Sequence, residues 1–170
     1  MVIEKLISRS SQERRYFVLA LFCVACIGIG AIGGWVTSSS VSTWYPTLRK
    51  PWFNPPNSLF APVWTALYLI MAVAAWRVWL KGDAEEKSKA LHMFWFQLFL
   101  NLLWSVIFFG LRQIGIALAE IVFLLVAISL TTFLFWRIDR WAGMLMLPYL
   151  SWVAFATILN ASLWLLNPAS

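Results

Sequence analysis

The hydrophobic residues of this 170-residue chain gather into five long stretches, which short polar or basic segments separate. The stretches cover about residues 16–36, 59–80, 92–111, 114–136 and 141–166. One helix needs about 20 apolar residues to cross the hydrocarbon core of a bilayer. Each stretch is long enough, so the pattern predicts an all-α membrane protein, a bundle of five transmembrane helices.

The composition supports this prediction. The chain is 62% hydrophobic and only 12% charged, whereas about a quarter of the residues are charged in a typical soluble domain. We therefore expect a single transmembrane domain over residues 16–167, preceded by a basic tail over residues 1–15. Cys23 and Cys26 lie inside the first stretch and are expected to be small buried apolar residues. No metal site is predicted.

The basic residues alternate between the two sides of the predicted bundle. One side carries most of them: Lys5, Arg9, Arg14, Arg15, Arg77, Lys81, Lys87, Lys89, Arg137 and Arg140. The other side carries Arg49, Lys50 and Arg112. The positive-inside rule then predicts a cytoplasmic N-terminus. This loop pattern, rather than a single basic patch, argues for a lipid bilayer as partner and against nucleic acid.

The first connection, residues 37–58, differs from an ordinary linker. It contains Pro46, Pro51, Pro55 and Pro56, and it is also rich in aromatic side chains. A flexible linker is usually polar and rich in glycine or serine, whereas proline stiffens this segment. We expect it to pack as a structured lid over one end of the bundle. The alternative is an aromatic belt at the membrane interface with no ligand beneath it.

Several motifs in the printed sequence resemble the TspO/MBR family, the tryptophan-rich sensory proteins and the translocator protein or peripheral-type benzodiazepine receptor. The first runs WYPTLRKPWFNPP from Trp44, followed by PVWTALY from Pro62. Others are LNLLW from Leu100, DRWAG from Asp139 and PYLSWVAFATILN from Pro148. The resemblance covers about residues 17–167. It implies a five-helix bundle whose ligand cavity is closed by the first loop.

The resemblance also implies which residues contact a ligand. Ligand contact is implied for Trp64, Asn101, Trp104, Trp152 and Ala156, and a lid role for Trp44, Tyr45 and Pro51. Helix periodicity adds Asn160, because Trp152, Ala156 and Asn160 are four residues apart and share one helix face. From the residues alone, Asn101 could instead be a clamp between helices, and Trp152 could be ordinary core packing.

Other polar and aromatic residues have simpler expected roles. Trp35, Trp76, Trp79, Trp136 and Trp141 lie near the ends of the stretches and are expected to anchor the helices at the interface. Asp139 is expected to form an ion pair or a helix cap. Glu120 lies inside the fourth stretch, where a charge is costly; it could face a polar cleft, reach the interface or be protonated. His92, a conceivable haem ligand, lies far from the predicted cavity.

The functional prediction is a membrane receptor or sensor for tetrapyrroles such as porphyrin or haem precursors, with a role in tetrapyrrole regulation or the stress response. No obligatory cofactor is expected; porphyrin or haem would be the ligand. The resemblance implies two alternatives: a transporter of porphyrins or sterol-like lipids, and light-dependent porphyrin degradation, for which Trp64 and Trp152 match the family's paired tryptophans. An enzyme is not favoured, because the sequence offers no nucleophile with a neighbouring base.

Two further expectations concern partners and location. Gly30 and Gly34 form a G-x-x-x-G match in the first stretch, which is compatible with a homodimer. The favoured location is a bacterial plasma membrane, with a mitochondrial outer membrane or a plant endomembrane as alternatives.

Overall fold

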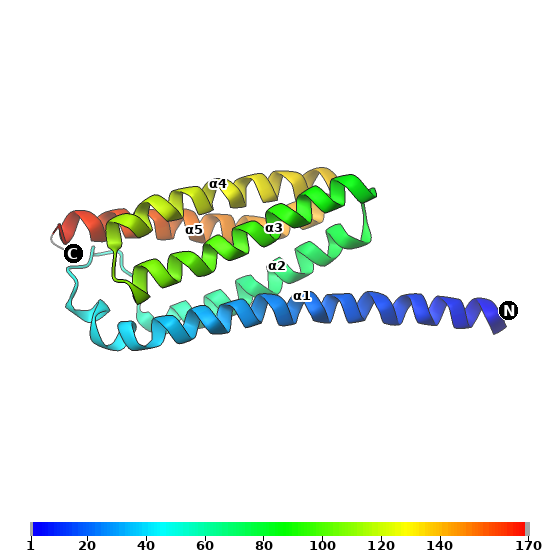
Figure 1. Ribbon diagram of the computed structural model, residues 1–170, viewed down its shortest axis with the longest axis horizontal. Coiled ribbons are helices and arrows are strands. Elements are labelled where there is room, and N and C mark those ends of the chain that lie inside the picture. Colours follow the sequence, from blue (N-terminus) through cyan, green and yellow to red (C-terminus); the bar gives the residue numbers. More distant parts are fainter. Residues whose placement is uncertain (1, 169–170) are drawn as a thin grey trace.

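The computed structural model describes the backbone of residues 2–168 and the side chains of residues 12–168. Its five main helices lie side by side along one long axis (Figure 1). The elements are α1 (Val2–Thr43), η1 (Tyr45–Thr47), η2 (Asn57–Leu59), α2 (Phe60–Leu80), α3 (Ala84–Ser105), η3 (Val106–Gly110), α4 (Ile114–Ile138) and α5 (Arg140–Leu166). Within the described part of the chain there is no β-strand, as the sequence predicts.

Five helices are long and apolar enough to cross a membrane, so the predicted number of spans is confirmed. α1 is the longest, and its N-terminal part extends beyond the other helices (Figure 1). The helix includes residues 2–15 of the predicted basic tail, although the side chains of Lys5 and Arg9 lie outside the described residues.

Two boundaries differ from the sequence prediction. α1 continues to Thr43, although the lid loop was expected to begin at residue 37. The serine and threonine hydroxyls in this last part, including Ser42 and Thr43, donate to helix carbonyls three or four residues earlier, so they do not interrupt the helix. The first proline comes only at Pro46. α3 begins at Ala84 rather than at residue 92, because Asp83 caps its N-terminus by accepting from the Glu86 amide at 2.9 Å.

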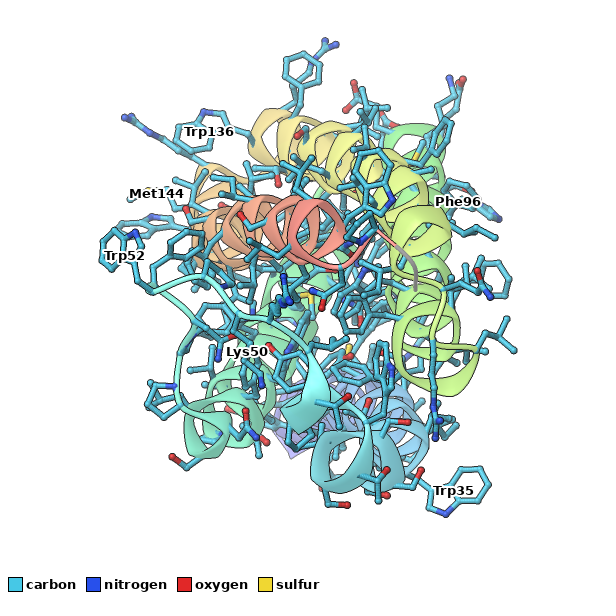
Figure 2. All side chains as sticks on the ribbon, turned by 90° about the vertical axis from the view of Figure 1, so that its left-hand side faces the viewer. Trp35, Lys50, Trp52, Phe96, Trp136 and Met144 are labelled. Atoms are coloured by element: carbon cyan, nitrogen blue, oxygen red, sulfur yellow. The ribbon has the colours of Figure 1, made fainter. Side chains whose placement is uncertain are left out.

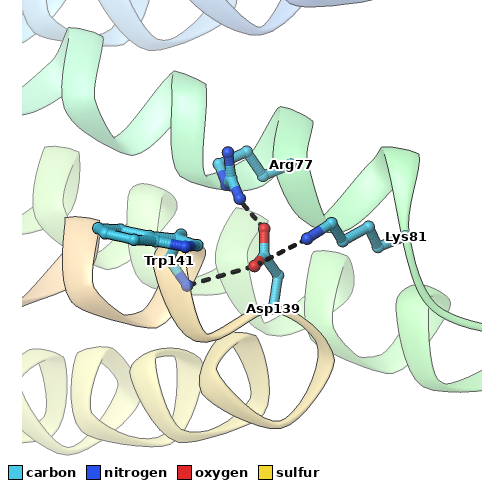
Figure 3. Close-up of polar contacts among 4 residues, drawn as sticks. All are labelled: Arg77, Lys81, Asp139 and Trp141. Carbon is cyan, nitrogen blue, oxygen red and sulfur yellow. Dashed lines mark hydrogen bonds and ion pairs between the residues drawn. The ribbon is translucent and has the colours of Figure 1, made fainter.

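One end of the bundle is held by an ionic clamp at the turn between α4 and α5 (Figure 3). Asp139 is almost fully buried and accepts from Arg77 Nε at 2.7 Å and from Lys81 Nζ at 3.1 Å. It also caps α5 by accepting from the Trp141 amide at 3.2 Å. Asp139 therefore forms both contacts that its position suggested. We call this end of the bundle the clamp end, and the opposite end, where the first loop lies, the lid end.

The clamp end is close-packed around aromatic and aliphatic side chains. Phe94 of α3 stacks on Phe135 of α4 at 5.7 Å between ring centroids, and both are fully buried. Gly143 lies so close to Trp136 that an added Cβ would fall 2.8 Å from its Cα. This packing fixes α3, α4 and α5 relative to one another.

Candidate ligand cavity under the first loop

A cavity of about 470 Å³ lies in the lid end, between α1, α2, α3 and α5. This volume falls within the range of about 300–1,000 Å³ typical of small-molecule sites. Most of the predicted contact residues line it: Tyr45, Trp64, Asn101, Trp104, Trp152, Ala156 and Asn160. Trp44 and Pro51 belong to the loop above but do not line the cavity. Residues far apart in the sequence are thus brought together as expected.

The cavity walls are aromatic on three sides. On the α2 side, the ring centroids of Trp64 and Tyr68 lie 5.7 Å apart. On the α5 side, Trp152 lies 6.1 Å from Phe60, edge to face. On the α3 side, Trp104 stacks on Phe108 at 5.1 Å with their planes 26° apart. Such walls offer large flat apolar surfaces with few polar groups, which suits a flat apolar ligand.

A buried polar network crosses the floor of the cavity. The Tyr68 hydroxyl donates to Asn101 Oδ1 at 2.5 Å, and Asn101 Nδ2 donates to the Tyr149 hydroxyl at 3.1 Å. The Tyr149 hydroxyl in turn donates to Gln97 Oε1 at 2.8 Å. Asn101 therefore joins α2, α3 and α5, so the interpretation of this residue as an interhelical clamp is confirmed, while the same residue also lines the cavity.

A second set of hydrogen bonds between helices lies nearer the first loop. The indole N–H of Trp104 donates to Asn160 Oδ1 at 3.1 Å, and Asn160 Nδ2 donates to the Ile114 carbonyl at 3.0 Å. These bonds orient the indole of Trp104 and leave its ring in the wall. By contrast, within the described residues the indole N–H groups of Trp64 and Trp152 form no hydrogen bond. Those two groups are available to a ligand.

Sequence reasoning missed the contribution of α1 and of a π-helical turn. The turn η3 follows α3, and its wider spacing places both Phe108 and Phe109 beside the cavity. Ser40 of α1 donates to the Phe109 carbonyl at 2.6 Å, which joins α1 to this turn. The two phenylalanines are visible in the sequence, but hydrophobic periodicity does not distinguish a π turn from an α turn.

The first loop packs against the lid end of the bundle. Tyr45 is 3% exposed, packs on Phe108 and Phe109, and donates to Asn54 Oδ1 at 2.6 Å. Burial raises the pKa of the Tyr45 hydroxyl to about 12, so it remains a donor at neutral pH. Asn167, after α5, accepts from the Arg49 amide and donates to the Arg49 carbonyl, both at 3.0 Å. Side-chain and backbone contacts thus fasten the loop.

The basic residues of the loop differ in availability. Lys50 Nζ lies 5.0 Å from the centre of the Tyr45 ring and donates to the Pro46 carbonyl at 3.3 Å. Its position within the folded loop is visible from the lid end (Figure 2). Arg49 is exposed, and its guanidinium forms no ion pair with any side chain described. Arg49 is therefore the more available of the two for a ligand's acidic group.

Other residues considered from the sequence lie outside the cavity wall. Glu120 is buried, and neither carboxyl oxygen has a hydrogen-bond partner among residues 12–168. His92 contacts the Ser88 carbonyl of its own helix through Nδ1. Cys23 and Cys26 are free thiols packed in the core. No group of three or more potential metal ligands occurs within the part of the chain that the structure describes.

The tryptophans predicted as anchors lie away from the cavity. Viewed from the lid end, Trp35 and Trp136 point outward around the rim of the bundle, and so does Trp52, a first-loop residue that was not predicted as an anchor (Figure 2). Trp35 is 78% exposed, and Trp76 donates its indole N–H to the Arg15 carbonyl at 2.9 Å. Trp76 and Trp79 are half-buried against the core, so the five predicted anchors do not all point outward, but none of them lines the cavity.

Comparison with known proteins agrees with the motifs. The model of the TspO/MBR family matches residues 20–165. The chain belongs to the TspO/MBR family. It is 40% identical to the tryptophan-rich protein TspO of Archaeoglobus fulgidus over 144 residues, which are 85% of this chain and 93% of that protein.

Other members of the TspO/MBR family resemble the chain to a similar degree. It is 39% identical to protein CrtK of Rhodobacter capsulatus over 154 residues, covering 89% of this chain and 93% of the relative. It is 39% identical to the human translocator protein over 123 residues, covering 71% and 73%. Family membership and the five apolar helices identify an integral membrane protein, and these names support a receptor or sensor role.

Proposed function

We propose that this protein is a membrane receptor that binds tetrapyrroles such as porphyrins in the cavity under the first loop. The observation that carries the proposal is the convergence of Trp64, Trp104 and Trp152 from three helices on one cavity of about 470 Å³. Stacking on indole faces suits a flat conjugated ring.

The polar groups support the same ligand class. The indole N–H groups of Trp64 and Trp152 can donate to ring nitrogens or carboxylates of a ligand. The exposed guanidinium of Arg49 lies in the loop above, where it can meet an acidic side group. A ligand with an apolar disc and acidic edges would match this arrangement. Ala156 leaves room on the α5 side because its side chain is a single methyl group.

The location and topology of the receptor are also proposed. The clamp end carries Arg77, Lys81, Arg137 and Arg140, whereas Arg49, Lys50 and Arg112 lie at the lid end. By the positive-inside rule the clamp end and the N-terminus face the cytoplasm of a bacterial plasma membrane. The ligand site then faces the outer leaflet.

The test is a titration with protoporphyrin IX of the protein held in phosphatidylcholine nanodiscs, followed by tryptophan fluorescence and porphyrin absorbance. The receptor function predicts saturable quenching at one ligand per cavity, with a shift of the porphyrin band. The control is protein-free nanodiscs mixed with a soluble tryptophan analogue. Quenching of the protein that rises linearly with porphyrin, as in this control, would show only partitioning into lipid and would overturn the proposal.

Two alternatives are distinguished in the same system. A transporter would carry porphyrin across sealed vesicles, whereas a receptor would bind it without flux above that of protein-free vesicles. Light-dependent degradation would bleach the bound porphyrin under illumination in air, and bleaching would fall in Trp64→Phe and Trp152→Phe variants. Both tryptophans line the cavity, which is the observation that favours testing this chemistry.

A further inference from the structure

The cavity has an open side between α1 and α2. The cavity-lining residues that are exposed all belong to these two helices and the turn before α2: Ala31, Gly34, Ser38, Asn57, Ala61 and Thr65. The lining residues contributed by α3, η3 and α5 are buried or half-buried. We call this opening, bordered by those six residues, the side portal.

The two borders of the side portal are regular stripes of small side chains. On α1, Ala31, Gly34 and Ser38 are spaced by three and four residues, and on the α2 side Asn57, Ala61 and Thr65 are spaced by four. Such spacing places each set on one helix face. Both stripes lie within candidate membrane spans, so the opening faces lipid rather than water.

The portal closes towards the clamp end, where α1 and α2 come into contact. A Cβ added at Gly30 would lie 2.6 Å from a ring carbon of Tyr68, so here the backbone of α1 lies directly on a side chain of α2. Next to it, Cys26 is fully buried in the core. By contrast, a Cβ at Gly34 would meet no atom within 4 Å. The opening therefore begins within one helical turn of the Gly30–Tyr68 contact.

The hydroxyl groups at the portal are already satisfied by their own helices. Thr37 donates to the Gly33 carbonyl at 2.7 Å, Ser38 to the Trp35 carbonyl at 2.8 Å and Thr65 to the Ala61 carbonyl at 2.9 Å. An apolar molecule that passes between the helices thus breaks no hydrogen bond of these groups. Leaving a buried donor unpaired would otherwise cost about 1–3 kcal/mol.

The first loop lies over the water-facing mouth of the cavity. The loop above it is fastened by the two hydrogen bonds between Asn167 and Arg49, by the Tyr45–Asn54 bond and by burial of the Tyr45 ring. Entry through the mouth would require these contacts to break together, whereas entry through the side portal requires none of them to break.

We propose that the ligand reaches the cavity from the bilayer, through the side portal between α1 and α2, while the first loop remains closed. The ligand class is a flat amphiphile that first dissolves in the leaflet on the lid side, with its disc among the acyl chains. This inference rests on the proposed function and adds the route to that same site. The loop then acts as a fixed roof, and access depends on the spacing of α1 and α2.

The experiment measures binding rates by stopped-flow tryptophan quenching, with protoporphyrin IX and protein in phosphatidylcholine nanodiscs. The narrowed variant is Gly34→Phe with Ala61→Phe. The matched control is Gly28→Phe with Ala66→Phe, because these residues are exposed on the same helices but do not line the cavity. An added Cβ at Gly28, as at Gly34, meets nothing within 4 Å.

We expect the association rate of the narrowed variant to fall by about tenfold, and its dissociation rate to fall as well, because a narrower portal slows passage in both directions. The control variant should keep the wild-type rates. Asn167→Ala, which loosens the loop, should also leave the association rate unchanged. Gly34→Leu alone is a milder version of the narrowed variant, with a smaller expected slowing, and a thermal melt checks that it folds.

Two results would overturn the side portal. The first is wild-type rates in both the narrowed variant and Gly34→Leu, with faster association in Asn167→Ala, which would place entry at the mouth. The second is weaker binding caused only by faster dissociation, which would mean that the new rings occupy the site itself. Failure of the proposed function is distinct, because wild-type protein would then show no saturable quenching at equilibrium.

Discussion

The clamp end and the lid end of the bundle use the same helices for opposite purposes. At the clamp end, Phe94 and Phe135 are fully buried and stack on each other, and Asp139 ties α2 to the turn between α4 and α5. At the lid end, Trp64 and Trp152 are only half-buried and border a cavity of about 470 Å³. Aromatic side chains fill one end and surround a space at the other.

This difference separates stability from ligand binding. Close packing at the clamp end contributes most to the free energy of unfolding where side chains are fully buried. A cavity forgoes such contacts, so its walls need support from hydrogen bonds such as those of Asn101 and Asn160. Substitutions at the clamp end should therefore lower the free energy of unfolding, whereas substitutions in the cavity wall should lower ligand affinity.

The largest stability effect is expected for Phe94→Ala at the clamp end. Removal of a fully buried phenylalanine from a packed core typically costs about 3–5 kcal/mol. Denaturant-induced unfolding in detergent micelles would measure the loss, while porphyrin affinity of the folded protein should stay the same. Phe96→Ala is the matched control, because Phe96 lies on the same helix and is 52% exposed. Equal losses in both variants would contradict a packed clamp end.

A smaller loss is expected for Asp139→Asn, which removes the charge that Arg77 and Lys81 share. Because the Arg77 and Lys81 side chains are 29% and 53% exposed, water can replace part of the interaction, and we expect a loss of about 1–2 kcal/mol. The matched control is Glu85→Gln, which breaks the exposed pair with Lys89 and should cost under about 0.5 kcal/mol. Both are measured by the same unfolding experiment.

The same clamp predicts an acid dependence of stability. Burial of Asp139 opposes its ionisation, but hydrogen bonds from Arg77 and Lys81 outweigh burial and lower the pKa of this carboxyl below its ordinary value. The stabilisation is thus complete above about pH 4 and is lost as the pH falls through the lower folded-state pKa. Melting temperatures measured against pH should show this loss in wild-type protein. An unchanged acid dependence in Asp139→Asn would contradict the assignment.

The smallest effect is expected for Asn167→Ala at the lid end. It removes two hydrogen bonds to the backbone of Arg49, each worth about 0.5–1.5 kcal/mol. The loss should remain local: amide hydrogen exchange in residues 45–54 should become faster, with little change in global unfolding. Asn57→Ala is the comparison, because no hydrogen bond of its side chain lies within the described residues. Unchanged exchange in Asn167→Ala would show that the loop is held by packing alone.

The fold could be predicted from the hydrophobic pattern, whereas most of the cavity wall was implied by the motifs that resemble the TspO/MBR family, and helix periodicity supported it. Residues Trp152, Ala156 and Asn160 share a face at a spacing of four, and all three line the cavity. The predicted ionic role of Asp139 followed from its place in a short loop between helices. Periodicity is sufficient in these cases because each helix is continuous.

Three features could not be predicted from hydrophobic periodicity. The extension of α1 to Thr43 arises from hydroxyl-to-carbonyl bonds within a run of serines, which resembles a loop in sequence. The side portal depends on the distance between α1 and α2, and hydropathy carries no information on that distance. The hydrogen bonds between Asn167 and Arg49 join residues 118 positions apart in the sequence.

The central claim is that indoles from separate helices form the ligand site, and the most direct test is a comparison of two double variants. Equilibrium titration with protoporphyrin IX in nanodiscs would compare Trp64→Ala/Trp152→Ala with Trp35→Ala/Trp136→Ala, which removes two outward-facing indoles. The account predicts at least about a hundredfold loss of affinity in the cavity pair, since each lost aromatic contact costs about 1.5–3 kcal/mol. It predicts no loss in the outward pair. Equal affinities for both variants would contradict it.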